Sequence, residues 1–245
     1  MRAPLGIKLC GLKTPEAIAI ANALAPTMVG FVLAHGKART VNRETLEVLV
    51  PLVAPSIGRV AVFLNESLEE VLDVARSGLV THVQCHQLLS WEEETRWAEA
   101  IGRVKTPEGA SMGLIRAFAM RSPQDVTRAL QSPAAIRLLD AAHPGSGQVF
   151  DDRWLTEATG FTDDERGFWL AGGLSAETVS RAIERNRAWG LKGVDVSSGI
   201  ETNGEKDPQK MQAFVDAVRN AECETTRAEC ERDRTPAGKP NFLGV

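Results

Sequence analysis

The chain has 245 residues and a formal net charge of −4, and without a basic block it gives no reason to expect binding to nucleic acid or to an anionic membrane. Four cysteines are too few for a disulfide framework in a chain of this size, and the N-terminus lacks the long apolar core of a signal peptide. No run approaches the ~20 apolar residues needed to span a bilayer, so we expect a cytoplasmic protein.

Short apolar runs alternate with helical patterns along most of the chain. Continuous apolar runs of this kind are typical of buried parallel strands. In chain order we predict strands at 7–11, 28–34, 59–64, 80–85, 114–119, 135–140, in the run that ends at Gly172 and Gly173, and at 191–196. Helices are predicted at about 15–25 with Thr14 as N-cap, 43–53, 68–78 with Ser67 as N-cap, 91–101, from 123 onward, within 151–159, between the last two strands, and at 208–219.

Eight strand–helix alternations indicate a βα-repeat architecture. An open doubly wound sheet would show the same alternation, but the count of eight and a length near the ~250 residues of a typical barrel favour closure. We therefore predict an α/β protein with a single-domain (β/α)8 (TIM) barrel over residues 1–221. Residues 222–245 are polar and lack a sustained period, so we predict a C-terminal tail outside the barrel, mobile in part.

The first candidate catalytic group is Cys10, because active sites of such barrels lie at the C-terminal ends of the strands. Lys8 lies two residues earlier on the same strand face, about 7 Å away, and a nearby ammonium lowers the pKa of a thiol. The alternative is that Cys10 is a small buried apolar residue, as free cysteines usually are. The residues alone favour this alternative.

The second candidate is Asp140, which ends the sixth predicted strand. A carboxylate there is uncommon unless it has a partner or a task. Partial burial in a cleft would raise its pKa and allow it to act as a general acid. It could instead cap backbone N–H groups of the following loop, but the glycine-containing loop that begins soon after favours function.

Glycine and serine residues follow the last two strands, where barrels of this type often bind phosphate. Glycine lets the backbone approach a ligand, and backbone N–H groups with a helix N-terminus suit an anion. A third glycine cluster, after the sixth strand, is consistent with a phosphate cradle or a hinge. The predicted phosphate-binding residues are Gly145, Gly147, Gly172, Gly173, Ser197, Ser198 and Gly199.

Three further polar residues lie at strand ends. Arg39, after the second strand, could bind a carboxylate or phosphate, although a lone loop arginine is usually only solvated. His86 follows the fourth strand and Asp195 lies in the eighth. His82 and His86 would be about 13 Å apart on a strand, too far to share one ion, so we predict no metal site.

Three sequence motifs together resemble the phosphoribosylanthranilate isomerase family, (β/α)8 enzymes of tryptophan biosynthesis. They are the opening KLCG, the LLDAA with its GSGQVFD loop, and the ending VDVSSGIE with KD, within a match over residues 7–219. The resemblance implies the Amadori rearrangement of N-(5-phosphoribosyl)anthranilate to 1-(2-carboxyphenylamino)-1-deoxyribulose 5-phosphate, an aldose–ketose isomerisation without a cofactor. It implies that Cys10 is the general base, Asp140 the general acid and Arg39 the ligand of the anthranilate carboxylate, with His86 and Asp195 near the substrate.

The loops after strands two and four depart from the family pattern, with Arg39 in a KART segment and Gln87 after His86. Two alternatives therefore stay open. One is another sugar-phosphate isomerase or epimerase on the same barrel, and the other is a catalytically silent barrel that acts as a binding protein. In the favoured interpretation the partner is a small phosphorylated substrate, and the protein is a monomer or a homodimer.

Overall fold

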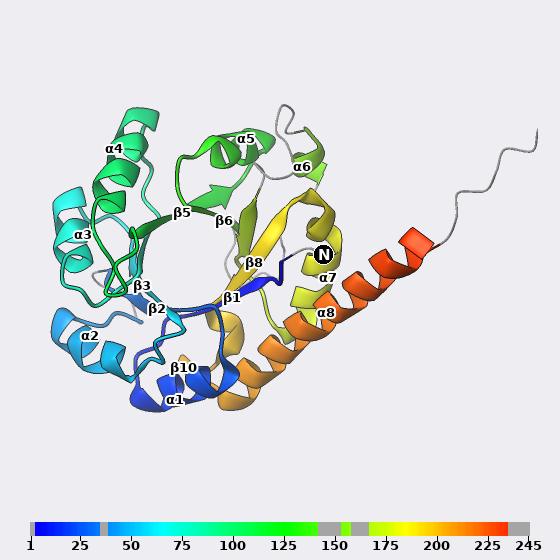
Figure 1. Cartoon of the computed structure of the whole chain (residues 1–245), viewed down its shortest axis with the longest axis horizontal. Helices are drawn as coiled ribbons and strands as arrows, with labels where there is room; N and C mark the ends of the chain where they lie inside the picture. Colours follow the sequence, from blue (N-terminus) through cyan, green and yellow to red (C-terminus); the bar gives the residue numbers. More distant parts are fainter. Residues whose placement is uncertain (1–2, 35–38, 142–152, 158–166, 235–245) are drawn as a thin grey trace, which may run out of the picture.

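Eight parallel strands close into a barrel, each paired with its neighbours in chain order and the first paired with the last (Figure 1). The computed structural model describes residues 3–34, 39–141, 153–157 and 167–234, with the backbone alone for 156–157 and 224–234. The strands are β1 Gly6–Cys10, β2 Met28–Val32, β3 Gly58–Phe63, β4 His82–Cys85, β5 Gly113–Met120, β6 Ile136–Ala141, β7 Phe168–Ala171 and β8 Leu191–Val196. The predicted TIM barrel is confirmed, and the strand ends differ from the predicted ones by at most two residues.

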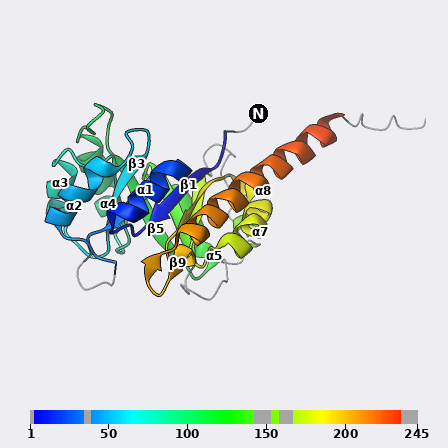
Figure 2. The same ribbon diagram turned by 90° about the horizontal axis from the view of Figure 1, so that it is seen from below.

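Helices surround the barrel on its outer side (Figures 1 and 2). They are α1 Pro15–Leu24, α2 Arg43–Leu49, α3 Leu68–Ala75, α4 Trp91–Gly102, α5 Pro123–Gln131, α6 Arg153–Glu157, α7 Ala176–Asn186 and α8 Pro208–Arg234. Two predicted N-caps are confirmed. The Thr14 hydroxyl accepts a hydrogen bond from the Ala17 N–H at 3.2 Å, and Ser67 forms a reciprocal capping box with Glu70.

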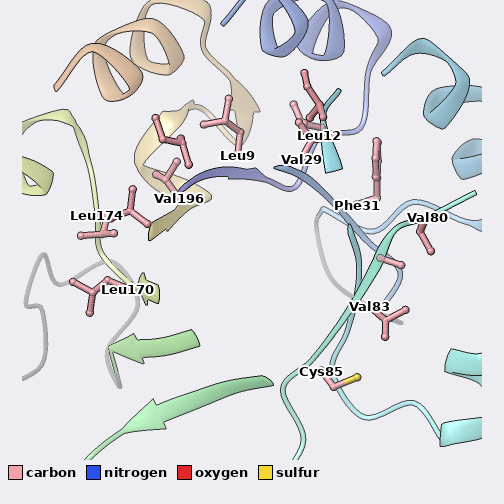
Figure 3. Packing of buried hydrophobic residues seen from close by; sticks show 14 of the residues in the cluster. Leu9, Leu12, Val29, Phe31, Val80, Val83, Cys85, Leu170, Leu174 and Val196 are labelled. Carbon is pink, nitrogen blue, oxygen red and sulfur yellow. The ribbon is translucent and has the colours of Figure 1, made fainter. Parts of the chain in front are cut away.

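The strands are buried on both faces. Leu9, Phe31 and Val83 belong to the outer apolar layer between strands and helices (Figure 3). Alternate strand positions point inward, where a second apolar cluster fills the barrel. This inner cluster consists of Cys10, Met28, Val60, Val62, Ile115, Ala117, Leu138, Trp169 and Ala171. Within the described residues, polar inward positions are therefore few.

Two helices differ from the sequence-based expectation. The predicted helix at 43–53 stops at Leu49 and continues as the 3-10 helix η1, Val50–Leu52, because Pro51 has no N–H to donate within an α-helix. The predicted helix at 208–219 instead extends as α8 to Arg234 and runs past the barrel (Figures 1 and 2). The polar stretch after 221 therefore begins as helix, since the missing amphipathic period reports on burial and not on helix formation.

A small hairpin after β8 was not predicted. The 3-10 helix η3, Ser198–Ile200, leads into β9, Glu201–Thr202, which pairs antiparallel with β10, Glu205–Lys206. Asn203 and Gly204 form the turn with φ angles of 52° and 81°, a conformation that Asn and Gly adopt most readily. Within the described residues, none of the helices is both long enough and apolar enough to cross a membrane.

Candidate active site

Cys10 is the last residue of β1 and belongs to the inner apolar cluster. Gly11 turns the chain away with φ +80°, and the N–H groups of Gly11 and Leu12 both donate to the Gly30 carbonyl, at 2.8 and 3.0 Å. A Cβ at Gly30 would lie 2.8 Å from Cys10 Sγ and 3.2 Å from Lys8 Nζ. The glycine on β2 thus leaves space for a thiol and an ammonium inside the barrel.

Lys8 and Asp195 form an ion pair inside the barrel. Lys8 Nζ donates to both carboxylate oxygens of Asp195 at 3.0 Å, and the side chains are only 1% and 8% exposed. Burial by itself would lower the pKa of Lys8, but the negative charge of Asp195, with a smaller contribution from Cys10 when its thiol is ionised, outweighs burial and raises the pKa. Lys8 therefore remains an ammonium. Asp195, which the sequence predicts to lie near the substrate, accepts hydrogen bonds from Lys8.

The Cys10 thiol is held largely protonated by its surroundings. Burial raises its pKa, and the Lys8 ammonium and Lys206 lower it by less. Lys8 therefore lowers the pKa of Cys10 as expected, but burial raises that pKa by more. Once the proton has left Cys10, the Lys8 ammonium stabilises the resulting thiolate.

Asp140 lies near the end of β6 and has a pKa raised to about 6, first by burial and then by the charge of Asp195, with Lys8 acting in the opposite direction. Gly172 packs directly against it, since a Cβ there would lie 2.5 Å from Asp140 Oδ1. The same ion pair thus acts on both Cys10 and Asp140. The structure brings the two predicted catalytic residues to one site inside the barrel mouth.

The loops after β7 and β8 lie against each other. Gly172 and Gly173 have φ angles of +84° and +64°, which favour glycine, and α7 begins a few residues later with Ser175 as N-cap. A Cβ at Gly199 would lie 1.9 Å from the Leu174 carbonyl oxygen. The two glycine-containing loops and the N-terminus of an 11-residue helix therefore meet at one edge of the mouth, as a phosphate site requires.

Ser197 joins this edge to β1, because its hydroxyl donates to the Cys10 carbonyl at 3.2 Å. Ser198 begins the adjacent 3-10 helix. Gly145 and Gly147, also predicted to bind phosphate, lie outside the described residues.

Arg39 is held by an acidic residue that the sequence analysis did not select. Its Nε and Nη2 donate to the two carboxylate oxygens of Glu201, both at 2.6 Å. Lys206 Nζ donates to the same carboxylate at 2.7 Å and to the Ser197 carbonyl at 2.9 Å. The Asn203–Gly204 dipeptide was the available signal, since an Asn–Gly turn predicts a hairpin that places Glu201 opposite Lys206.

His86 follows β4 and is neutral at pH 7. Burial, and then the charges of Lys8 and Arg116, lower its pKa to about 4. Gln84 Nε2 lies 2.9 Å from His86 Nε2. Arg116 donates to the carbonyls of Cys85 and Gln87 at 2.9 and 2.8 Å, and so fixes the backbone on both sides of His86. Arg116 and Gln84 were also missed, because pairing between strands decides their contacts.

Within the described residues, no group of three or more His, Cys, Asp or Glu side chains is placed to hold a metal ion. The titratable groups of the mouth are instead a thiol, a carboxyl group and two ion pairs, Lys8–Asp195 and Arg39–Glu201. A general acid and a general base with neighbouring cations suit proton transfer on a small anionic substrate.

A family model described as N-(5'phosphoribosyl)anthranilate (PRA) isomerase matches residues 7–217. The N-(5'-phosphoribosyl)anthranilate isomerases of Acetivibrio thermocellus and Deinococcus radiodurans are 33% and 34% identical to this chain, and each match covers 88% of it and 96% and 97% of the relative. The crystal structure of the isomerase from Thermotoga maritima superimposes with a TM-score of 0.74 at 30% identity, over 88% of this chain and 99% of that one. A further isomerase structure, in complex with reduced 1-(o-carboxyphenylamino)-1-deoxyribulose 5-phosphate, gives 0.72 at 28% identity with the same coverage.

Proposed function

The chain belongs to the N-(5'-phosphoribosyl)anthranilate isomerase family, and we propose that Cys10 is the general base and Asp140 the general acid of its reaction. The observation that carries these assignments is the Lys8–Asp195 pair, whose charges act on both groups at the C-terminal ends of the strands. The isomerisation is an internal oxidoreduction, in which an aldose derivative becomes a ketose. Carbon 1 is reduced and carbon 2 is oxidised within one molecule, so the chemistry requires no cofactor.

In the first step Asp140, as the carboxylic acid, donates its proton to the ribose ring oxygen. The bond between that oxygen and carbon 1 breaks, and the nitrogen lone pair forms a protonated imine with carbon 1. Cys10, as the thiolate, then removes the proton from carbon 2. The electrons of that bond form a carbon–carbon double bond, the imine nitrogen recovers its lone pair, and the enolamine tautomerises to the ketone.

The resting protonation states are the reverse of the acting ones. With a pKa of about 6, Asp140 is mainly ionised at pH 7, whereas the raised pKa of Cys10 keeps it mainly a thiol. The acting thiolate and carboxylic acid carry the same total charge and differ only in where one proton lies. The Lys8 ammonium supports the acting state because it stabilises the thiolate.

The two anionic ends of the substrate are assigned to two different positively polarised parts of the mouth. The phosphate is bound by backbone N–H groups of Gly172, Gly173, Ser197, Ser198 and Gly199, aided by the α7 N-terminus. Gly145 and Gly147 remain predicted phosphate ligands. The anthranilate carboxylate is bound by Arg39, and His86 presents a neutral imidazole near the reacting carbons. These clamps hold the sugar between the acid and the base.

The protein is proposed to act in the cytoplasm on this small phosphorylated substrate, with no nucleic acid or membrane as a partner. A monomer and a homodimer are both compatible with the site, because all of its proposed residues come from one chain. The Thermotoga maritima relative is described as dimeric.

The direct test is turnover of N-(5-phosphoribosyl)anthranilate, followed by the loss of anthranilate fluorescence. The wild-type chain should show saturable turnover without added metal. Cys10→Ala and Asp140→Asn should each bind the reduced product analogue and fail to turn the substrate over at a comparable rate. Wild-type protein that is folded but inactive would contradict the function, and active variants would contradict the assigned residues.

A further inference from the structure

Glu201 and Arg39 form a bidentate ion pair at the rim of the mouth. The two hydrogen bonds, Nε to Oε1 and Nη2 to Oε2, are both 2.6 Å long. The Glu201 side chain is 7% exposed and that of Arg39 is 36% exposed. A planar guanidinium bound along one edge cannot rotate about its last bonds without breaking both contacts. The carboxylate therefore sets the plane and direction of the Arg39 guanidinium.

Among the described residues, this pairing leaves one edge of Arg39 for a ligand. Glu201 occupies the Nε–Nη2 edge, and the Nη1–Nη2 edge is the other donor fork of a guanidinium. The Arg39 side chain lies beside the residue that follows Cys10, because a Cβ added to Gly11 would lie 2.9 Å from Arg39 Cδ and 3.2 Å from Ser197 Oγ. A substrate carboxylate at this position can be bound through two parallel hydrogen bonds.

Lys206 gives the group its net charge. Arg39 and Glu201 alone would form a neutral pair with little attraction for an anion. Lys206 is 3% exposed and binds Glu201 at 2.7 Å, so the three side chains together carry one positive charge. Burial alone would raise the pKa of Glu201, but the hydrogen bonds from Arg39 and Lys206 outweigh it and lower the pKa, which keeps Glu201 ionised.

Glu201 on β9 and Lys206 on β10 are paired across the hairpin, which fixes their relative positions. Lys206 also donates to the Ser197 carbonyl at 2.9 Å, next to the phosphate-side loop. The hairpin thus connects the two proposed anion sites of the mouth.

From these contacts we infer that Glu201, held by Lys206, is a positioning residue that selects a carboxylated aromatic substrate by directing the free edge of Arg39 toward the carboxylate. The inference rests on the proposed function. Glu201 itself does not touch the substrate, and its effect passes through Arg39.

A substitution of Glu201 separates positioning from simple charge attraction. Glu201→Gln removes a negative charge beside Arg39, so charge attraction alone predicts tighter binding of a carboxylate ligand. Positioning predicts weaker binding, because the amide NH2 faces a donor of Arg39 and the bidentate contact is lost. The two explanations therefore differ in the sign of the effect.

The measurement is calorimetric binding of two ligands to the folded protein. One is reduced 1-(o-carboxyphenylamino)-1-deoxyribulose 5-phosphate, and the other is the same molecule with hydrogen in place of the carboxyl group. Glu201→Gln should lower the affinity for the carboxylated ligand about tenfold or more, as expected for the loss of a charge-assisted hydrogen bond. The affinity for the ligand without the carboxyl group should not change. With the substrate itself, KM should rise much more than kcat falls.

Matched variants complete the test. Glu205→Gln removes the exposed ion pair of the same hairpin with Lys13 and should change neither affinity. Arg39→Ala should weaken the carboxylated ligand, and adding Glu201→Gln to it should cause no further loss. If Glu201→Gln does not fold, Lys206→Met provides a second measure and should also reduce the preference for the carboxylated ligand.

An unchanged or increased preference for the carboxylated ligand in Glu201→Gln would overturn the inference. An equal loss for both ligands would overturn it too, because that is the result of a merely structural role. Wild-type protein that turns over the substrate while either result is found would leave the proposed function intact. Wild-type protein that neither turns over the substrate nor binds the analogue would overturn both.

Discussion

Lys8 holds Asp195 through both carboxylate oxygens at 3.0 Å, across the junction of the first and last barrel strands. Both side chains are almost completely buried, so neither charge can be compensated by water. The pair is therefore a structural requirement of the barrel interior as well as an electrostatic neighbour of Cys10 and Asp140.

Lys8→Met should destabilise the protein by about 3–5 kcal/mol, because it leaves the Asp195 carboxylate buried without a partner. Lys8→Met combined with Asp195→Leu should recover much of that loss, since an apolar pair of similar volume is often tolerated. Urea unfolding of both variants measures the difference. A single variant as stable as the wild type would contradict the buried, charged state of Asp195.

Asp140→Asn should lower kcat by about 10²-fold or more while stabilising the fold above pH 6. The folded protein raises the pKa of this carboxyl from 3.8 to about 6, so it binds the proton more tightly than the unfolded chain does. Wild-type stability should therefore fall as pH rises from about 4 to 6 and stay lower above it, by roughly 3 kcal/mol at most. Urea unfolding at pH 4 and pH 8 should show the gain for the variant at pH 8 alone.

The pH profile of kcat/KM should rise up to about pH 6 and fall only in the alkaline range. The active form needs the Cys10 thiolate and the Asp140 carboxylic acid at the same time. Between the two pKa values the thiolate fraction rises with pH while the carboxylic acid fraction falls, so their product stays constant. The lower limb then reports Asp140 and the upper limb Cys10, whose pKa lies above its ordinary value. Cys10→Ser should displace the upper limb and leave the lower one in place. Displacement of the lower limb would reverse the assignment.

Gly199→Ala should impair substrate binding, because its Cβ would lie 1.9 Å from the Leu174 carbonyl oxygen and would force the loops after β7 and β8 apart. The overpacking should cost about 1–3 kcal/mol and raise KM. Gly78→Ala is the matched control, since Gly78 has φ +73° and, among the described residues other than its chain neighbours, no heavy atom lies within 4 Å of an added Cβ. It should lower stability by backbone strain and leave KM unchanged. Equal KM values for both variants would count against the proposed phosphate site.

Gly173→Asp should raise KM about tenfold or more by placing a negative charge at the proposed phosphate site. Gly173 has φ +64°, so any side chain adds backbone strain at this position. Gly173→Ala carries the same strain without the charge and isolates the electrostatic part. Steady-state kinetics at low and high salt should show a larger difference between the two variants at low salt.

The order of strands and helices could be predicted because local sequence patterns determine it, such as the apolar runs and the Thr14 and Ser67 caps. Cys10 and Asp140 could be selected because a barrel brings strand ends together whatever the exact register. Lys8 with Asp195, and Arg39 with Glu201, could not be paired in advance, since 187 and 162 residues separate the partners. Those contacts depend on closure of the barrel and on a hairpin turn.

The junction of β1 with β8 also has a consequence for synthesis. Lys8 and Cys10 leave the ribosome well before Asp195 and Glu201, which lie more than 180 residues further along the chain. A nascent chain that lacks β8 therefore exposes both edges of an open parallel sheet, with an unpaired lysine where the interior is to form. The proposed catalytic site can form only after the last strand docks. Two fragments divided between β4 and β5 should accordingly be inactive alone and regain activity on mixing.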